Sequence, residues 1–275
     1  MAMRYVRIAN MIKIRTACRA PLASAHSPCG LGALGLTVAK GMVNQGARRL
    51  IPFSRRALPQ RTTRSSTHHY ETTTSTAIQT ILTLEHLGAT VHCLSIDITL
   101  PTAASTLLTA LSTLNLPPVA GVIHATGTIH NQLISQSTPS FFAAVLAPKV
   151  RGALTLHTCF PPASANLDFF VLSSSCGQLL GFLGQASYAS GNAFLDALAL
   201  TRSRRAQGDR NALSLLWTSW RGLGMGVSSS GALEAELYAR GITDISPDEA
   251  FRAWSPVAAL PGGRGSRCGS EDEGA

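Results

Sequence analysis

The strongest constraint on the fold is an alternation, through the middle of the chain, between short β-branched runs and longer stretches with helical periodicity. Such alternation is typical of βαβ units, in which helices connect the strands of a parallel sheet. Strands are expected in the segments RLIPFSRR, TVHCLSIDI, VAGVIHATG, LDFFVLSSS and ALSLLWTSW. We therefore predict an α/β fold built on a doubly wound parallel sheet.

Helical patterns separate these strands. They are expected at about 31–45, 75–87, 102–114, 139–157 and 186–205, followed by two short helices near 233–240 and 247–254. The 275 residues are enough for one sizeable core. We predict an uncertain N-terminal segment at 1–29, one α/β domain at 30–255, and a disordered tail at 256–275 that is rich in Gly, Ser and charge.

Charge is distributed unevenly along the chain, whose formal net charge is +9. Residues 1–70 contain twelve Lys or Arg and no acid, because Glu71 is the first acidic residue. This basic third suits a phosphate-bearing ligand or an acidic protein partner. No nucleic-acid motif accompanies it, so we expect no nucleic acid as partner. Residues 1–29 have the composition of a mitochondrial presequence, but an incorrectly assigned start of the gene explains them equally well.

Several classes of protein are disfavoured. No run of eighteen or more apolar residues is present, so we expect no membrane span. The six cysteines are scattered and have no paired metal-ligand spacing, so we expect free thiols in a cytoplasmic protein and no metal site.

Gly30, Gly32 and Gly35 form a G-x-G-x-x-G motif at the start of the first expected helix. In a strand–turn–helix setting these glycines allow a tight turn, close approach to a pyrophosphate and close packing of helix against strand. The helix N-terminus then offers free N–H groups to the phosphates. The preceding segment RAPLASAHSPC is a poor strand because two prolines interrupt it, so a plain structural turn remains the alternative.

The residues after the second expected strand bear on the type of dinucleotide. Dinucleotide sites that bind NAD carry an acidic residue near this position for the ribose 2′-hydroxyl. Here the chain has Ser54, Arg55 and Arg56 instead. A guanidinium suits the 2′-phosphate of NADP, although two solvated surface arginines are the alternative.

Four polar residues form a candidate reactive group. Tyr188 and Asn192 are four residues apart on an expected helix and share a face. Ser175 ends a strand, and Lys149 lies near the end of an earlier helix. These side chains are expected at the carboxyl edge of the sheet, where open α/β folds bind ligands.

The chemistry of ketone reduction suits these four residues. Hydride delivery to a ketone leaves negative charge on oxygen, which needs a proton donor and hydrogen bonds. Tyr188 would donate the proton, and a nearby Lys149 ammonium would lower the tyrosine pKa from about 10. Ser175 would bind the carbonyl, and Asn192 would hold Lys149 or a water. Taken singly, each residue has a structural alternative in packing, capping or solvation.

Several longer segments carry a family resemblance. GLGALG, FSRRALP, VIHATG, LAPKVRGALTLH, DFFVLSSSCGQLLGFLGQASYASGNAFLDALA and LLWTSWRGLGM occur in this order. The chain resembles the ketoreductase domain of polyketide synthases, within the short-chain dehydrogenase/reductase superfamily. Residues 174–225 are most similar to the 6-methylsalicylic acid synthase type, a partially reducing iterative synthase. In this family Asn replaces the Lys of the usual Tyr-x-x-x-Lys motif, as Asn192 does here, and the lysine is Lys149.

The resemblance implies a Rossmann-like catalytic subdomain that uses NADPH to reduce a β-keto thioester on an acyl carrier protein, with other synthase domains as further partners. It implies catalytic roles for Lys149, Ser175, Tyr188 and Asn192. It also implies cofactor contacts for Gly30, Leu31, Gly32, Leu34, Gly35, Ser54, Arg55, Asp97, Ile98, Ala125 and Gly127.

Departures from the family leave two alternatives open. Pro28 and Cys29 stand where the family has Thr-Gly, and Cys29 does not favour the positive φ that glycine allows. Only 29 residues precede Gly30, so we expect the upstream structural half of the family to be absent. One alternative is therefore a non-catalytic or truncated remnant. The other is a stand-alone reductase of free ketones.

Overall fold

The computed structural model describes residues 12–14, 31–64, 72–162, 167–204, 212–223 and 231–258. Within these ranges the strands are β1 (Ile12–Ile14), β2 (Arg49–Leu50), β3 (Phe53–Ser54), β4 (Thr90–Val91), β5 (Leu94–Ser95), β6 (Val119–His124), β7 (Phe169–Ser175) and β8 (Ala212–Trp217). The helices are α1 (Ala33–Asn44), α2 (Thr72–His86), α3 (Ala103–Thr113), α4 (Pro139–Cys159), α5 (Gly177–Leu180), α6 (Ala186–Arg204), α7 (Gly231–Ala239) and α8 (Pro247–Ala258), with 3-10 turns at Arg61–Thr63 and Ile134–Gln136.

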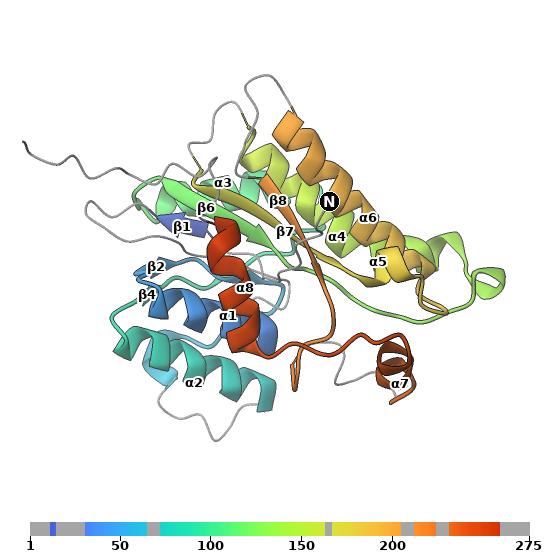
Figure 1. The fold of residues 1–275 in the computed structure, drawn as a ribbon. Helices are drawn as coiled ribbons and strands as arrows, with labels where there is room; N and C mark the ends of the chain where they lie inside the picture. Colours follow the sequence, from blue (N-terminus) through green and yellow to red (C-terminus); the bar gives the residue numbers. More distant parts are fainter. Residues whose placement is uncertain are drawn as a thin grey trace, which may run out of the picture.

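The main sheet has the strand order β4-β2-β1-β6-β7-β8 (Figure 1). The pairs β2–β4, β6–β7 and β7–β8 are parallel, as the sequence predicts. β1 differs, because it runs antiparallel to both β2 and β6. The centre of the sheet is therefore filled by Ile12–Ile14, from the segment that the sequence left uncertain, and the expectation of an entirely parallel sheet is wrong at this strand.

Proline divides one predicted strand in two. The segment RLIPFSRR forms β2 and β3, with Ile51 and Pro52 between them. Proline has no N–H to donate to a ladder, and β3 pairs with β5 in a separate two-stranded sheet. The Leu94 N–H donates to the Pro52 carbonyl at 2.7 Å, which keeps the two short pairs adjacent. The predicted strand TVHCLSIDI is also divided, into β4 and β5, with His92 and Cys93 between them and no proline.

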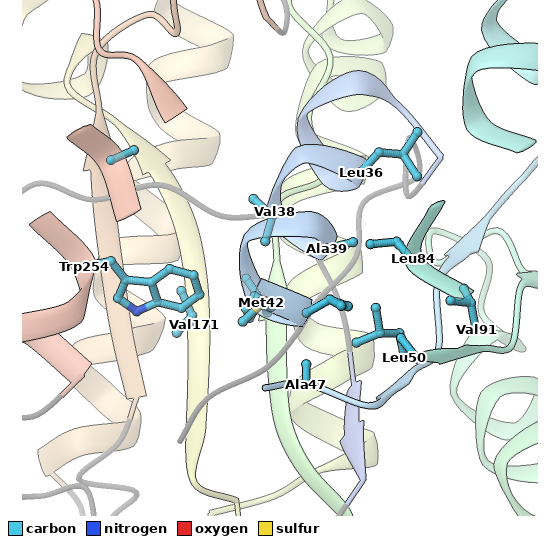
Figure 2. Close-up of a cluster of buried hydrophobic side chains, with 14 of the residues drawn as sticks. Leu36, Val38, Ala39, Met42, Ala47, Leu50, Leu84, Val91, Val171 and Trp254 are labelled. Atoms are coloured by element: carbon cyan, nitrogen blue, oxygen red, sulfur yellow. The ribbon is translucent and has the colours of Figure 1, made fainter. Parts of the chain in front are cut away.

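The two faces of the sheet carry separate cores. One core packs residues of α1, α2 and α8 against the sheet, and Figure 2 shows Met42, Leu84 and Trp254 within it. The other packs α3, α4 and α6 against the opposite face. Neighbouring residues of one strand divide between these cores, since Phe170 belongs to the second and Val171 to the first. Helices on both faces confirm the doubly wound α/β fold.

Helix boundaries agree with the sequence prediction to within a few residues, with two differences that matter. The short helix α5, directly after β7, was not predicted. Helix α8 continues to Ala258, past the point at which the sequence predicted a disordered tail. Its amphipathic pattern places Ala250 and Trp254 in the core one turn apart, which stabilises a helix here.

Candidate active site

Ser175 occupies the carboxyl end of β7, opposite Trp217 at the end of β8. Its hydroxyl donates to the Trp217 carbonyl at 3.3 Å and accepts the Gly177 N–H at 3.2 Å. The second contact lies at the start of α5, so the serine side chain joins the strand end to this short helix. Ser175 is partly accessible, and the long bond to Trp217 leaves its hydroxyl able to turn to another acceptor.

Tyr188 and Asn192 lie on α6 and are almost completely buried, with 6% and 0% of their surfaces exposed. The Asn192 amide donates to the Tyr188 carbonyl at 2.8 Å, so the two residues are linked along one helix face. The Oδ1 atom of Asn192 is buried and has no hydrogen-bond partner among the described residues. This acceptor therefore does not bind the Lys149 ammonium directly, which was one of the two predicted roles of Asn192.

Lys149 is the third buried member, with 3% of its surface exposed. It lies in the middle of α4, whereas the sequence predicted a position near the end of a helix. Its Nζ atom donates to the Ser173 carbonyl at 3.0 Å and lies 5.2 Å from the centroid of the Tyr188 ring. The lysine stem passes close to α6, because a Cβ built on Gly191 would lie 3.3 Å from Lys149 Cδ.

These positions have an electrostatic consequence. A cation near a phenol stabilises the phenolate and lowers the pKa of the phenol. Burial weakens the screening of this attraction by water, but it also disfavours the charged phenolate by desolvation. Within this pair, the Lys149 charge is the contribution that favours the phenolate of Tyr188.

Asp196, one turn beyond Asn192, is an acidic neighbour that the sequence analysis did not single out. Its carboxylate accepts hydrogen bonds from Gln178 of α5, at 2.7 Å, and from Ser214 of β8. Burial raises the pKa of Asp196, while hydrogen bonds from Ser214 and Ser174 and the charge of Lys149 act in the opposite direction. This carboxylate therefore connects α6 to α5 and to β8.

His124 ends β6 and is fully buried. Its Nε2 atom lies 3.0 Å from the Lys149 carbonyl oxygen. Burial and the nearby Lys149 charge lower the pKa of His124 to about 3, so the ring is neutral at neutral pH. In the sequence this histidine stands out only as part of the motif VIHATG. Neither periodicity nor spacing along the chain indicates that it reaches α4.

The glycine-rich turn is described from Leu31 onward, and Gly30 lies outside the described residues. Gly32 is the N-cap of α1, with an extended backbone and no side-chain cap, and Gly35 is buried in the first turn. Leu31 and Leu34 pack partly against the first core. The first turn of α1 has no acidic residue, so its N–H groups and dipole favour an anion.

The residues after β3 and β5 lie together. Ser54 is buried and its hydroxyl donates to the Arg56 carbonyl at 2.7 Å, whereas Arg55 is exposed. The Ser95 hydroxyl donates to the Arg55 carbonyl at 3.3 Å and thereby joins the two loops.

Asp97 follows β5, and its carboxylate accepts the N–H and hydroxyl of Thr99 at 2.9 and 2.7 Å. Ile98 is buried, and its carbonyl accepts the Thr155 hydroxyl of α4 at 3.0 Å. Beyond β6, Ala125 and Gly127 are partly accessible. An uncapped helix start, exposed arginines and small residues at the strand ends are the donor set that a dinucleotide phosphate requires. These features of the described residues are compatible with the phosphates of a dinucleotide.

Two negative findings apply to the described part of the chain. No group of three or more His, Cys, Asp or Glu side chains gathers there in a way that suits a metal ion. No helix there is long and apolar enough to cross a membrane.

The KR domain family matches residues 29–222. The chain therefore belongs to the ketoreductase domain family of polyketide synthases, a class of oxidoreductases with a Rossmann-like fold that uses NAD(P)H. It is 65% identical, over 96% of its length, to 6-methylsalicylic acid synthase of Aspergillus niger, and 48% identical, over 83%, to mellein synthase of Phaeosphaeria nodorum. The chain spans only 15% and 12% of these two multidomain proteins.

Solved structures agree with this assignment. The ketoreductase from the first module of phoslactomycin biosynthesis in Streptomyces sp. HK803 is 33% identical, with a TM-score of 0.67 over 86% of this chain and 52% of that one. The first ketoreductase of the tylosin polyketide synthase is 34% identical, with a TM-score of 0.63 over 86% of this chain and 45% of that one. The resemblance to polyketide ketoreductases that the sequence motifs indicated is confirmed.

Proposed function

We propose that this chain catalyses NADPH-dependent reduction of a β-keto acyl thioester, carried on an acyl carrier protein, to the β-hydroxy thioester. The observation that carries the proposal is the buried Lys149 ammonium 5.2 Å from the Tyr188 ring centroid. A buried cation held against a tyrosine stabilises the phenolate that remains after the tyrosine has donated its proton. The residues 30–255 would form the catalytic domain.

Four side chains of the site would have separate roles in the reduction. Bound NADPH would supply the hydride. The Ser175 hydroxyl turns from the Trp217 carbonyl to the substrate carbonyl and holds it. Tyr188 donates its phenolic proton to the developing alkoxide, and Lys149 stabilises the resulting phenolate. The buried Oδ1 of Asn192 offers an acceptor to a water in the path that reprotonates Tyr188.

The cofactor would lie along the carboxyl edge of the sheet. The turn at Gly30–Gly35, with Leu31, Gly32 and Leu34, would hold the pyrophosphate. Ser54 and Arg55 would bind the 2′-phosphate, Asp97 and Ile98 would contact the adenine, and Ala125 and Gly127 would line the nicotinamide side. Arg55 supports NADPH over NADH, because residues 55–70, which directly follow β3, contain no carboxylate to accept the ribose 2′-hydroxyl.

The relatives, which are large multidomain synthases, support a carrier-bound substrate and synthase partners for this chain. We propose that the chain works in the cytoplasm with an acyl carrier protein domain and other synthase domains. The acyl thioester is then delivered by the phosphopantetheine arm of the carrier and not by free diffusion.

Tyr188→Phe tests the mechanism. Loss of the proton donor should reduce β-keto reduction by roughly 10²- to 10⁴-fold, while NADPH binding measured by fluorescence titration stays unchanged. The matched control is Tyr238→Phe, because Tyr238 on α7 is 82% exposed. If Tyr188→Phe reduces the carrier-bound substrate as fast as the unaltered protein, the proposed role of Tyr188 is wrong.

A further inference from the structure

The main chain at Lys149 is held from outside its own helix. His124 ends β6, is fully buried, and places its Nε2 atom 3.0 Å from the Lys149 carbonyl oxygen. A carbonyl oxygen can only accept, so Nε2 carries the proton and donates it. The strand end and the middle of α4 are therefore joined at the residue whose side chain reaches Tyr188.

Small residues make room for this arrangement on two sides. A Cβ added at Gly152 would lie 2.9 Å from Cε1 of the His124 ring, which is closer than real contacts allow. A Cβ added at Gly191 would lie 3.3 Å from Cδ of the Lys149 stem. Gly152 thus admits the imidazole against α4, and Gly191 admits the lysine stem against α6.

The helix itself gives a reason for an outside anchor. Pro148 precedes Lys149 inside α4. Proline lacks an N–H and removes one intrahelical hydrogen bond from the turn that it enters. The helix is held less firmly by its own hydrogen bonds at this turn than elsewhere, so a bond from β6 has more influence on where Lys149 lies.

We propose that His124 is a positioning residue for Lys149, and that its Nε2 hydrogen bond sets the distance between the lysine ammonium and the Tyr188 ring. This inference rests on the proposed function of that pair. His124 touches neither Tyr188 nor substrate and acts through the α4 main chain. It remains neutral, because burial and the Lys149 charge lower the pKa of His124 to about 3, so it acts as a fixed donor and not as a switch.

Two substitutions at one position separate positioning from packing. His124→Gln keeps an amide donor at about the reach of Nε2, whereas His124→Asn keeps an amide donor at about the reach of Nδ1. Both remove the ring and leave a buried amide, so they should lower thermal stability similarly. Only His124→Asn should release the Lys149 carbonyl.

The first readout is the pKa of Tyr188, measured without cofactor from the ultraviolet absorbance of phenolate. The same titration of Tyr188→Phe isolates the signal of this tyrosine from the others. We expect His124→Asn to move the Tyr188 pKa upward, because the Lys149 ammonium then lies farther from the ring, and His124→Gln to leave it near that of the unaltered protein. Asp196 of α6 is a charged group that interacts with Lys149, and it is the same in both variants.

The second readout is the pH profile of reduction. Reduction requires protonated Tyr188, so the rate falls as pH rises through the Tyr188 pKa. For His124→Asn we expect kcat to fall by roughly 100-fold, as a misplacement of about 1 Å produces, and the falling limb to move to higher pH. A residue that merely supports the fold would lower the rate without moving that limb.

Gly152→Ala is the second variant, and it carries the test if His124→Asn does not fold. Its added methyl group displaces the imidazole without altering any group that titrates, so it should raise the Tyr188 pKa as well. An unchanged Tyr188 pKa in folded His124→Asn or Gly152→Ala would overturn the proposal, as would equal pKa shifts in the Gln and Asn variants. An unaltered protein that binds NADPH without reducing a β-keto thioester would instead refute the proposed function, and the titration would still decide the role of His124.

Discussion

At the scale of single residues, the site combines two kinds of position. Lys149, Tyr188 and Asn192 are buried and linked to the fold by hydrogen bonds or close contacts. Arg55 is exposed on the loop after β3. Buried groups have one arrangement because packing and hydrogen bonds determine it, whereas an exposed arginine acquires its geometry from the anion that it binds.

Cofactor choice is therefore testable at Arg55. Arg55→Ala should weaken NADPH binding by about 10- to 100-fold, since a hydrogen bond to a charged group contributes about 1.5–3 kcal/mol. Binding of NADH should change little, because NADH has no 2′-phosphate. Fluorescence titration with both cofactors measures this, with Arg151→Ala as control because Arg151 is an exposed arginine on α4. Equal weakening for NADPH and NADH would refute recognition of the 2′-phosphate by Arg55.

At the scale of elements, the site depends on where helices cross the sheet. Helix α6 packs on α4 and on β7 and β8, and its residues Tyr188 and Asn192 are buried on that side. The sequence predicted both helices and the shared face of α6 from periodicity. It did not predict α5, because four residues are too short for a helical pattern to be recognised.

The centre of the sheet is the element that departs most from the sequence prediction. Lys13 of β1 pairs with Leu50 of β2 on one side and with Gly121 of β6 on the other. Three residues thus connect the two halves of the sheet. A strand that pairs on both sides depends on its N–H groups more than an edge strand does.

Lys13→Pro should therefore destabilise the protein by about 1–3 kcal/mol, because proline removes a ladder N–H from a strand that is paired on both sides and leaves its acceptor unsatisfied. Urea unfolding followed by circular dichroism measures the free energy of unfolding. Lys13→Thr is the matched control, since it removes the same charge but favours a strand. If the two variants unfold at the same urea concentration, β1 does not hold the sheet together.

At the scale of the whole molecule, the chain corresponds to one part of much longer relatives. It spans 15% of the Aspergillus niger synthase that it matches. Binding energy from remote parts of a substrate contributes to catalysis at the reacting centre. A carrier-bound substrate offers such remote contacts through its arm and its protein, and a free ketone does not.

Turnover of the two forms of substrate decides between the remaining functions. The value of kcat/KM should be higher for a β-keto acyl group on a phosphopantetheinylated carrier protein than for a free small ketone. Absorbance of NADPH at steady state measures both. Faster turnover of the free ketone would favour a stand-alone reductase, and a folded chain that binds NADPH but reduces neither substrate would favour a non-catalytic remnant.

The sequence by itself determined the α/β class, the family and the order of the elements apart from β1 and α5. Periodicity and motif order are local properties of the chain, and the residues of each motif are neighbours in sequence. For the same reason the sequence supplied the candidates Lys149, Ser175, Tyr188 and Asn192, without their distances.

Only the tertiary structure decided which of these candidates touch. In the structure the Lys149 ammonium lies against the Tyr188 ring, and the Ser175 hydroxyl donates a hydrogen bond to the Trp217 carbonyl. The tertiary structure also brought His124, twenty-five residues away in sequence, to the Lys149 carbonyl, and set Ile12–Ile14 antiparallel at the centre of the sheet. These contacts join separate elements, so they depend on how helices and strands pack and leave no periodic signal in the sequence.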